Sequence, residues 1–177
     1  MRFETTPRFE LEDVRALAAS YSYRDDTAAI EAGRRARVAG FYTREDFLMV
    51  CGWKSARTRP LWSHTVNSER VVREVTRVAL STEVEQLKIA ALLALRGVSW
   101  ATASVLLHFA AREPYPILDY RALWSIGHHK PAMYSFELWW AYTEACRCLA
   151  KEAGVTMREL DRALWQYSKQ ESRSHRR

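Results

Sequence analysis

Apolar residues recur along most of the chain at intervals of three and four positions, which is the spacing of one face of an α-helix. No stretch shows the sustained alternation of apolar and polar residues that is typical of a half-buried β-strand. The pattern therefore predicts an all-α fold. The expected helices lie at residues 11–21, 26–38, 43–50, 71–78, 82–95, 99–109, 120–127, 138–149 and 156–167.

Several expected helices begin with a hydroxyl residue that an acidic residue follows three positions later, which is the pattern of a capping box. The pairs are Thr43 with Asp46, Thr82 with Glu85, and Thr156 with Glu159. The helix after Thr82 is apolar nearly all round and is expected at the centre of the fold. Residues 53–64 contain Pro60 and two tryptophans and are expected to form an ordered loop.

The composition fits one globular unit. The chain has 177 residues, of which 48% are hydrophobic and 27% charged, so it can bury a sizeable core. Three cysteines form no secreted disulfide framework, and Cys146, Cys148 and His108 lack the companions of a metal site. The N-terminus does not resemble a signal peptide, and the longest apolar run, 89–95, is too short to span a bilayer. We expect a cytoplasmic protein, associated with the nucleoid in a prokaryote, without membrane contact.

Basic residues outnumber acidic ones, with a net charge of +6, and are concentrated in two places. Residues 34–59 contain seven basic side chains against Glu45 and Asp46, and the tail at 169–177 adds four against Glu171. Such a clustered excess suits a polyanionic partner, because neutralised phosphates release counterions. A soluble protein with an Arg-rich surface explains the charge equally well.

The segment that joins the helices at 82–95 and 99–109 carries the most specific pattern. Gly97 stands where a left-handed residue ends a helix, and Ser99 is a good N-cap for the next helix. Only Val98 separates them, so two helices meet at a very tight turn. Its backbone N–H groups would form a pocket for one phosphate. The other interpretation of these residues is an ordinary helical corner.

Residues 95–103 resemble the helix-hairpin-helix of the DNA glycosylase superfamily (HhH-GPD), whose pattern is Leu-x-Gly-Val-Gly-x-x-Thr-Ala. A hydrophobic helix, an extended stretch at 114–118 and Asp119 then follow at the spacing of the family. The resemblance covers residues 82–127 and implies a two-lobed helical bundle. One lobe would contain residues 1–40 and 128–168, the other residues 41–127, and residues 169–177 would be a disordered basic tail. The matching residues are Leu95, Gly97, Val98, Thr102 and Ala103.

Two positions depart from the family pattern. Ser99 replaces the second glycine of the hairpin, which alters one phosphate contact. Ala101 stands where bifunctional members carry a nucleophilic lysine, so a Schiff-base lyase step through that position is excluded. The four-cysteine cluster of the iron–sulfur branch is also absent from the sequence. The resemblance therefore implies a monofunctional enzyme without a required cofactor or an iron–sulfur cluster. It also implies a site for K⁺ or Na⁺ on the carbonyls of Leu95, Gly97 and Val98.

The resemblance assigns catalysis to Asp119. Breaking an N-glycosidic bond builds positive charge on the sugar, and a carboxylate beneath the sugar stabilises that charge and orients the attacking water. Without the hairpin upstream, an aspartate before a helix at 120–127 is more often a plain N-cap. The two functions are compatible, because a helix N-terminus keeps a carboxylate ionised.

In the superfamily, the loop after the helix that corresponds to 43–50 lies beside the flipped nucleotide. Here that loop offers Trp53 to stack on an extruded base, with cations to hold phosphates or base edges. The other interpretation is that Trp53 and Trp62 anchor the core. We do not expect Lys54 to replace the missing nucleophile. The expected contacts of the base pocket or wedge are Trp53, Lys54, Arg57, Arg59 and Tyr120.

The resemblance thus implies a DNA glycosylase of base excision repair that flips a damaged or modified base and hydrolyses its N-glycosidic bond. It predicts a monomer whose partner is double-stranded DNA, with no obligate protein partner. Two alternatives stay open, namely a non-catalytic helix-hairpin-helix DNA-binding protein and a basic helical adaptor for an acidic protein. The identity of the base also stays open. Phosphate contacts are expected at Gly97, Val98, Ser99, Ala101 and Thr102.

Overall fold

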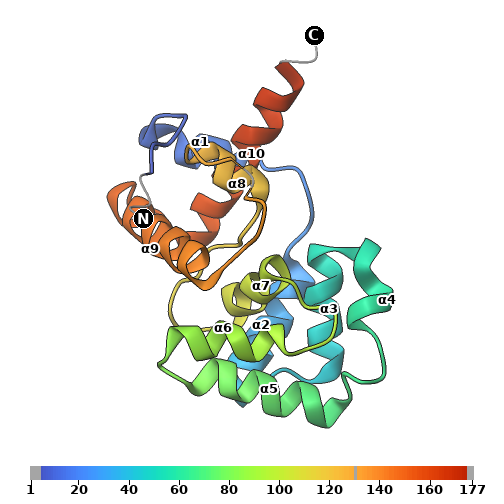
Figure 1. Ribbon diagram of the computed structural model, residues 1–177. Helices are drawn as coiled ribbons and strands as arrows, with labels where there is room; N and C mark the ends of the chain where they lie inside the picture. Colours follow the sequence, from blue (N-terminus) through green and yellow to red (C-terminus); the bar gives the residue numbers. More distant parts are fainter. Residues whose placement is uncertain (1–4, 130, 175–177) are drawn as a thin grey trace. The chain divides into compact units, whose positions relative to one another are not determined.

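Figure 1 shows the computed structural model of the protein, which describes residues 5–129 and 131–174. Within these residues every regular element is helical, with ten α-helices, two short 3₁₀ turns and no strand, so the all-α prediction is confirmed. No helix in this part of the chain is both long and apolar enough to cross a membrane. The internal contacts divide the chain into two compact units. We call them the hairpin unit (residues 24–115) and the terminal unit (residues up to 23 and from 116 on).

Helix α7 forms the centre of the hairpin unit. Its residues 102–107 are all buried, and it packs against α2, α3 and α6. Helix α6, which was predicted at the centre, is buried on one face only, and its Leu87 is 47% exposed. Helix α5 packs along α6 (Figure 1). The elements are α2 (Thr27–Ala39), α3 (Arg44–Lys54), η2 (Ala56–Thr58), α4 (Arg59–Trp62), α5 (Glu69–Ser81), α6 (Glu85–Leu93) and α7 (Trp100–Ala110).

Helices α2 and α7 pack with their backbones in close contact. A Cβ atom on Gly33 would stand 2.5 Å from both the Cβ and the carbonyl oxygen of Phe109, which is closer than real Cβ atoms approach. Glycine is therefore the residue that fits at this point of α2 without a shift of α7. The buried face of α2 continues with Ala29, Ala32 and Ala36.

Helix α10 forms the centre of the terminal unit, where it packs against α1, α8 and α9. Trp139 and Tyr142 of α9 are 0% exposed and supply the largest side chains of this core. Leu160 and Leu164 of α10 are fully buried as well, at the helical spacing that the sequence predicts. The elements are η1 (Leu11–Asp13), α1 (Val14–Ala19), α8 (Tyr120–Ser125), α9 (Phe136–Glu152) and α10 (Met157–Ser174).

The unit boundaries differ from those of the predicted lobes. Residues 24–40 were predicted with the termini but belong to the hairpin unit, because the small-residue face of α2 packs on α3 and α7. Residues 116–127 were predicted with the hairpin but belong to the terminal unit, because α8 packs on α10. The predicted disordered tail is helical over residues 169–174, as part of α10, while residues 175–177 lie outside the described residues.

One of the three predicted capping pairs is confirmed in full, and the pair at Thr43 is confirmed only in the half that involves the threonine hydroxyl, because the carboxylate of Asp46 binds Arg35 instead. The hydroxyl of Thr43 accepts the N–H three residues on at 3.1 Å. At the start of α10, the carboxylate of Glu159 accepts the N–H of Thr156 at 2.7 Å and the Thr156 hydroxyl accepts the N–H of Glu159 at 3.2 Å. The pair at Thr82 is wrong: its hydroxyl accepts the N–H of Val84 at 3.1 Å in a local turn, and α6 begins only after Val84.

The predicted loop at 53–64 is largely helical. Helix α3 extends to Lys54, and η2 and α4 follow in short succession. Pro60 stands in the first turn of α4, where its missing N–H costs no helical hydrogen bond. Trp62 is 2% exposed, so this tryptophan anchors the core. The segment therefore has a fixed helical shape.

Candidate functional site

The corner between α6 and α7 contains the predicted left-handed glycine and N-cap, but it is longer than predicted, because α6 ends at Leu93 and α7 begins at Trp100. Gly97 adopts a left-handed conformation, with φ at 75°, and Val98 turns inward to 8% exposure. Ser99 caps α7, since its Oγ accepts the N–H of Thr102 at 3.3 Å. The prediction of Ser99 as the start of the next helix is confirmed. The prediction that Gly97 ends the preceding helix is wrong, because α6 ends at Leu93 with Ala94 as its C-cap and Gly97 lies in the turn that follows.

The hydrogen bonds of the corner narrow the set of groups that can meet a phosphate. The N–H of Val98 donates to the carbonyl of Leu95 at 3.1 Å, and the N–H of Thr102 is engaged by Ser99. Two predicted contacts, at Val98 and Thr102, therefore have amides that are used inside the corner. The N–H groups of Trp100 and Ala101 stand in the first turn of α7, where no intrahelical acceptor exists. Ser99 is exposed, and Trp100 and Ala101 are half-buried.

Gly97 is also the point where the corner rests on α4. A Cβ atom on Gly97 would stand 2.6 Å from the carbonyl carbon of Leu61 and from the backbone nitrogen of Trp62. Glycine is therefore required twice, once by the positive φ and once by this contact. The 53–62 segment and the hairpin, which the sequence assigns to separate tasks, lie in direct contact within one unit.

A buried amide side chain strengthens the same contact. Asn67 is 1% exposed, and its Nδ2 donates to the carbonyls of Trp62 and Arg96, both at 2.9 Å. Its Oδ1 accepts the N–H of Arg96 at 3.0 Å. The guanidinium of Arg44 donates in turn to the carbonyl of Asn67 at 2.9 Å and to that of Ser63 at 2.8 Å. Sequence reasoning missed Asn67, because no local pattern marks a residue whose partner lies 29 positions away.

The first half of the 53–59 segment is engaged inside the hairpin unit. The indole N–H of Trp53 donates to the carbonyl of Asp25 at 3.1 Å, and the ring meets Phe109 edge to face, with centroids 5.2 Å apart. Trp53 and Lys54 are half-buried, whereas Arg57 and Arg59 are exposed. An apolar cavity of about 480 Å³ lies beside Trp53 and Arg59. Trp53 therefore combines a fixed position with a partly accessible ring.

Asp119 is placed at the start of α8 in the terminal unit. Its Oδ1 accepts the N–H of Arg121 at 2.9 Å, so the predicted N-cap is confirmed. Asp119 is half-buried, and the adjacent Tyr120 is 50% exposed. The guanidinium of Arg121 donates to the Ser168 carbonyl of α10 at 3.3 Å, which ties α8 to α10.

Ile117, two positions before Asp119, has both its N–H and its carbonyl held by hydrogen bonds. The N–H of Ile117 donates to Oδ1 of Asp161 at 3.1 Å, and its carbonyl accepts the hydroxyl of Tyr142 at 3.1 Å. Asp161 is 6% exposed and also accepts the guanidinium of Arg158 at 2.5 Å. The chain that leads into Asp119 is thereby fixed to α9 and α10.

The charge of Asp119 affects two nearby phenols. Burial raises the pKa of Tyr134, and the negative charge of Asp119 raises it further. Burial also raises the pKa of Tyr142, with smaller contributions from Cys146, Asp161 and Asp119. Both phenols are therefore neutral at pH 7, and both have raised pKa values partly because Asp119 carries a negative charge.

Other titratable groups are engaged in the structure. Nδ1 of His108 lies 2.6 Å from the carbonyl of Tyr115, as expected of a core or rim histidine. Burial raises the pKa of the Cys51 and Cys146 thiols well above the ordinary range, so neither is a nucleophile at neutral pH. The described residues contain no cluster of three His, Cys, Asp or Glu side chains that could hold a metal. The carbonyl of Leu95, predicted to bind K⁺ or Na⁺, keeps one lone pair for a cation after accepting the Val98 amide.

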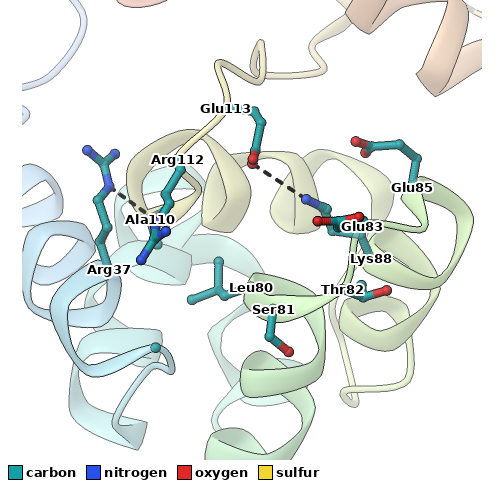
Figure 2. Close-up of a pocket in the computed structure, with 11 residues that line it drawn as sticks. Arg37, Leu80, Ser81, Thr82, Glu83, Glu85, Lys88, Ala110, Arg112 and Glu113 are labelled. Atoms are coloured by element: carbon teal, nitrogen blue, oxygen red, sulfur yellow. Dashed lines mark hydrogen bonds and ion pairs between the residues drawn. The ribbon is translucent and has the colours of Figure 1, made fainter.

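A charged cavity of about 530 Å³ lies between the end of α5 and the start of α6 (Figure 2). Lys88 lines it with a side chain that is 5% exposed, and its Nζ lies 3.6 Å from Oε2 of Glu113. Glu85, which also lines the cavity, accepts the hydroxyl of Tyr115 at 2.8 Å. These pairs fasten residues 113–115 to α6. The sequence offers no signal for this cavity, because the pattern predicts an apolar helix here.

No protein-family model matches the sequence, and no curated protein matches it either. The structure is similar to the crystal structure of the Methanocaldococcus jannaschii 8-oxoguanine glycosylase/lyase in complex with a 15mer DNA containing 8-oxoguanine. The TM-score is 0.50 at 16% sequence identity, and the match covers 90% of this chain and 80% of that chain. The fold is that of a helical DNA glycosylase, as the resemblance of residues 82–127 predicts.

Proposed function

We propose that this protein is a monofunctional DNA glycosylase of base excision repair. It would flip a damaged or modified base out of double-stranded DNA and hydrolyse its N-glycosidic bond. The fold, which is shared with a glycosylase/lyase crystallised with DNA, supports this proposal. Two features carry it, each observed within its own unit: a Gly97-Val98-Ser99 corner in which Ser99 caps α7, and a half-buried carboxylate, Asp119, that caps α8. The corner would bind DNA, and Asp119 would carry out the chemistry.

The corner would hold one phosphate through the N–H groups of Trp100 and Ala101 and the hydroxyl of Ser99. Amides at a helix N-terminus point outward and carry a partial positive charge, which suits a phosphate. The exposed Arg57 and Arg59 would add contacts to the backbone or to base edges. If K⁺ or Na⁺ binds the carbonyls of the corner, it adds positive charge there. The net charge of +6 favours the approach of a polyanion.

Asp119 would act on the sugar of the flipped nucleotide. As the C1′–N bond breaks, the electron pair leaves with the base and the sugar becomes cationic, which a nearby carboxylate stabilises. Water then attacks C1′, and its proton passes to the carboxylate or to solvent. Ala101 supplies no amine, so the enzyme would form no Schiff base at that position. The exposed Tyr120 and the half-buried Trp53 are the residues that we assign to contacts with the extruded base.

The test is base release from duplexes that carry alkylated, oxidised or deaminated bases, compared between wild type and Asp119→Asn. Asparagine is also a good N-cap, so this variant preserves the start of α8 while it removes the negative charge. We expect the wild type to release at least one base of the panel, and the variant to be slower by at least about 100-fold.

Two results would redirect the proposal. If the wild type binds duplex DNA but releases no base, the protein is a non-catalytic DNA-binding module. Trapping of a covalent DNA adduct by borohydride would contradict the monofunctional assignment and implicate an amine such as that of Lys54. Several phosphate contacts make the affinity for DNA fall steeply with salt concentration. An affinity for duplex DNA that does not change with salt would therefore point to an acidic protein as the partner.

A further inference from the structure

One buried side chain holds both sides of the residue just before the hairpin glycine. Asn67 accepts the N–H of Arg96 at 3.0 Å and donates to its carbonyl at 2.9 Å. Paired hydrogen bonds to the N–H and C=O of one residue fix its backbone in rotation as well as in position, as they do between neighbouring strands. The second N–H of the Asn67 amide donates to Trp62, so both donors and the oxygen are used.

The contact is reinforced on both sides. Gly97 packs against the backbone of Leu61 and Trp62 so closely that a Cβ atom would clash at 2.6 Å. On the far side, Arg44 donates to the carbonyl of Asn67, so that the segment carrying the amide is itself tied to α3. Asn67 thus connects three pieces of the hairpin unit, namely α3, α4 and the corner.

We propose that Asn67 is the positioning residue of the phosphate-binding corner. The inference rests on the proposed function, because it assumes that the corner binds DNA. Asn67 is 1% exposed and would not touch the nucleic acid itself. It would act by holding Arg96 and Gly97, and through them the direction of the amides at Trp100 and Ala101. Without Asn67 those amides would no longer be held toward a phosphate, so the protein would lose that contact and the affinity that it supplies.

The experiment measures the dissociation constant for an undamaged duplex over a series of salt concentrations, with the full chain kept well below its melting temperature. Asn67→Ala removes all three hydrogen bonds of the amide. We expect binding that is about tenfold weaker, with a salt slope lower by about 0.9, the change that corresponds to one lost phosphate contact. The slope separates positioning from general stability, since a folded but less stable protein keeps its number of phosphate contacts.

Thr76→Val is the matched control. Thr76 is also buried in the hairpin unit, and its hydroxyl accepts the N–H of Tyr42 at 2.9 Å and donates to the carbonyl of Val72 at 2.7 Å. Valine keeps the shape of the side chain and removes those bonds, which lead to the connection between α2 and α3 and to α5 itself rather than to the corner. We expect this variant to melt at a lower temperature and to bind DNA with the affinity and salt slope of the wild type.

A second variant keeps the inference testable if Asn67→Ala does not fold. Arg44→Gln removes the support behind Asn67 and is expected to change affinity and slope in the same direction by a smaller amount. A wild-type slope in both variants, or an equal loss in Thr76→Val, would overturn the inference while the proposed function stands. A wild type without salt-dependent DNA binding would overturn the proposed function and the inference with it.

Discussion

Each of the two units fixes the backbone of one residue that lies just before a residue of the proposed site, but the two units use different chemistry. In the hairpin unit a single neutral amide, that of Asn67, bonds both sides of Arg96. In the terminal unit two helices share the work, with Asp161 of α10 on the N–H of Ile117 and Tyr142 of α9 on its carbonyl. The first arrangement is uncharged, whereas the second buries a carboxylate.

This difference has an energetic consequence. Removing a neutral amide leaves unsatisfied backbone groups, each of which costs about 1–3 kcal/mol when buried. Removing one member of a buried ion pair also leaves a charge without its partner, which costs more. For each hydrogen bond that is lost, the terminal unit should therefore depend more strongly on Asp161 than the hairpin unit depends on Asn67.

The largest effect is expected for Asp161→Ala. The side chain of Arg158 is 17% exposed, so its guanidinium would lose this carboxylate in a mostly buried place, and the N–H of Ile117 would lose its acceptor. We expect the free energy of unfolding in urea to fall by about 3 kcal/mol. Asp161→Asn, which keeps an acceptor for Ile117, should lose less. A loss below about 1 kcal/mol in Asp161→Ala would show that the charge does not matter.

A smaller effect is expected on the hairpin side for Gly97→Ala. The new methyl group meets the backbone of Leu61, and alanine disfavours the left-handed conformation, so stability should fall by about 2 kcal/mol in urea unfolding. Gly40→Ala is the matched control, because Gly40 has φ at 77° and no atom lies within 4 Å of the place that its methyl group would take. Equal losses in the two variants would mean that the contact with Leu61 contributes nothing.

The smallest effect concerns the charge at the start of α10, which carries Asp161. Hydrogen bonds from the N–H and hydroxyl of Thr156 lower the pKa of Glu159. A lowered pKa in the folded state stabilises the protein above the unfolded pKa of about 4.3, and this stability is lost as the pH falls through the folded value. Glu159 is exposed to solvent screening, so Glu159→Gln should cost on the order of 0.5 kcal/mol at pH 7. Melting curves from pH 7 to pH 3 should show the difference disappear, and a constant difference would contradict this assignment.

Local patterns predicted the parts of the site that depend on neighbours in sequence. Ser99 and Asp119 begin helices through bonds to residues two or three positions away, and Gly97 adopts its left-handed conformation in the turn between α6 and α7. The predicted capping pair at Thr82 is wrong for a reason that is equally local. The Thr82 hydroxyl accepts the N–H of Val84, and α6 begins only after that residue. Short-range chemistry therefore explains both the success and the failure.

The parts that the sequence did not predict depend on packing between distant segments. The bonds of Asn67 to Arg96 span 29 positions, and those of Asp161 to Ile117 span 44. The assignment of residues 24–40 to the hairpin unit follows from a face of small residues, whose partner helix cannot be identified from spacing alone. The same holds for Lys88, whose burial depends on Glu113 and on the ring of Tyr115.

The close contact between α2 and α7 also affects a residue outside the core. Phe109, whose carbonyl and Cβ leave no room for a side chain on Gly33, is also the ring against which the edge of Trp53 rests. The absence of a side chain at the buried Gly33 thus sets the position of Phe109, and through it the position of the partly accessible indole of Trp53. We therefore expect a substitution of Gly33 to displace first the ring of Trp53, which we assign to contact with the extruded base.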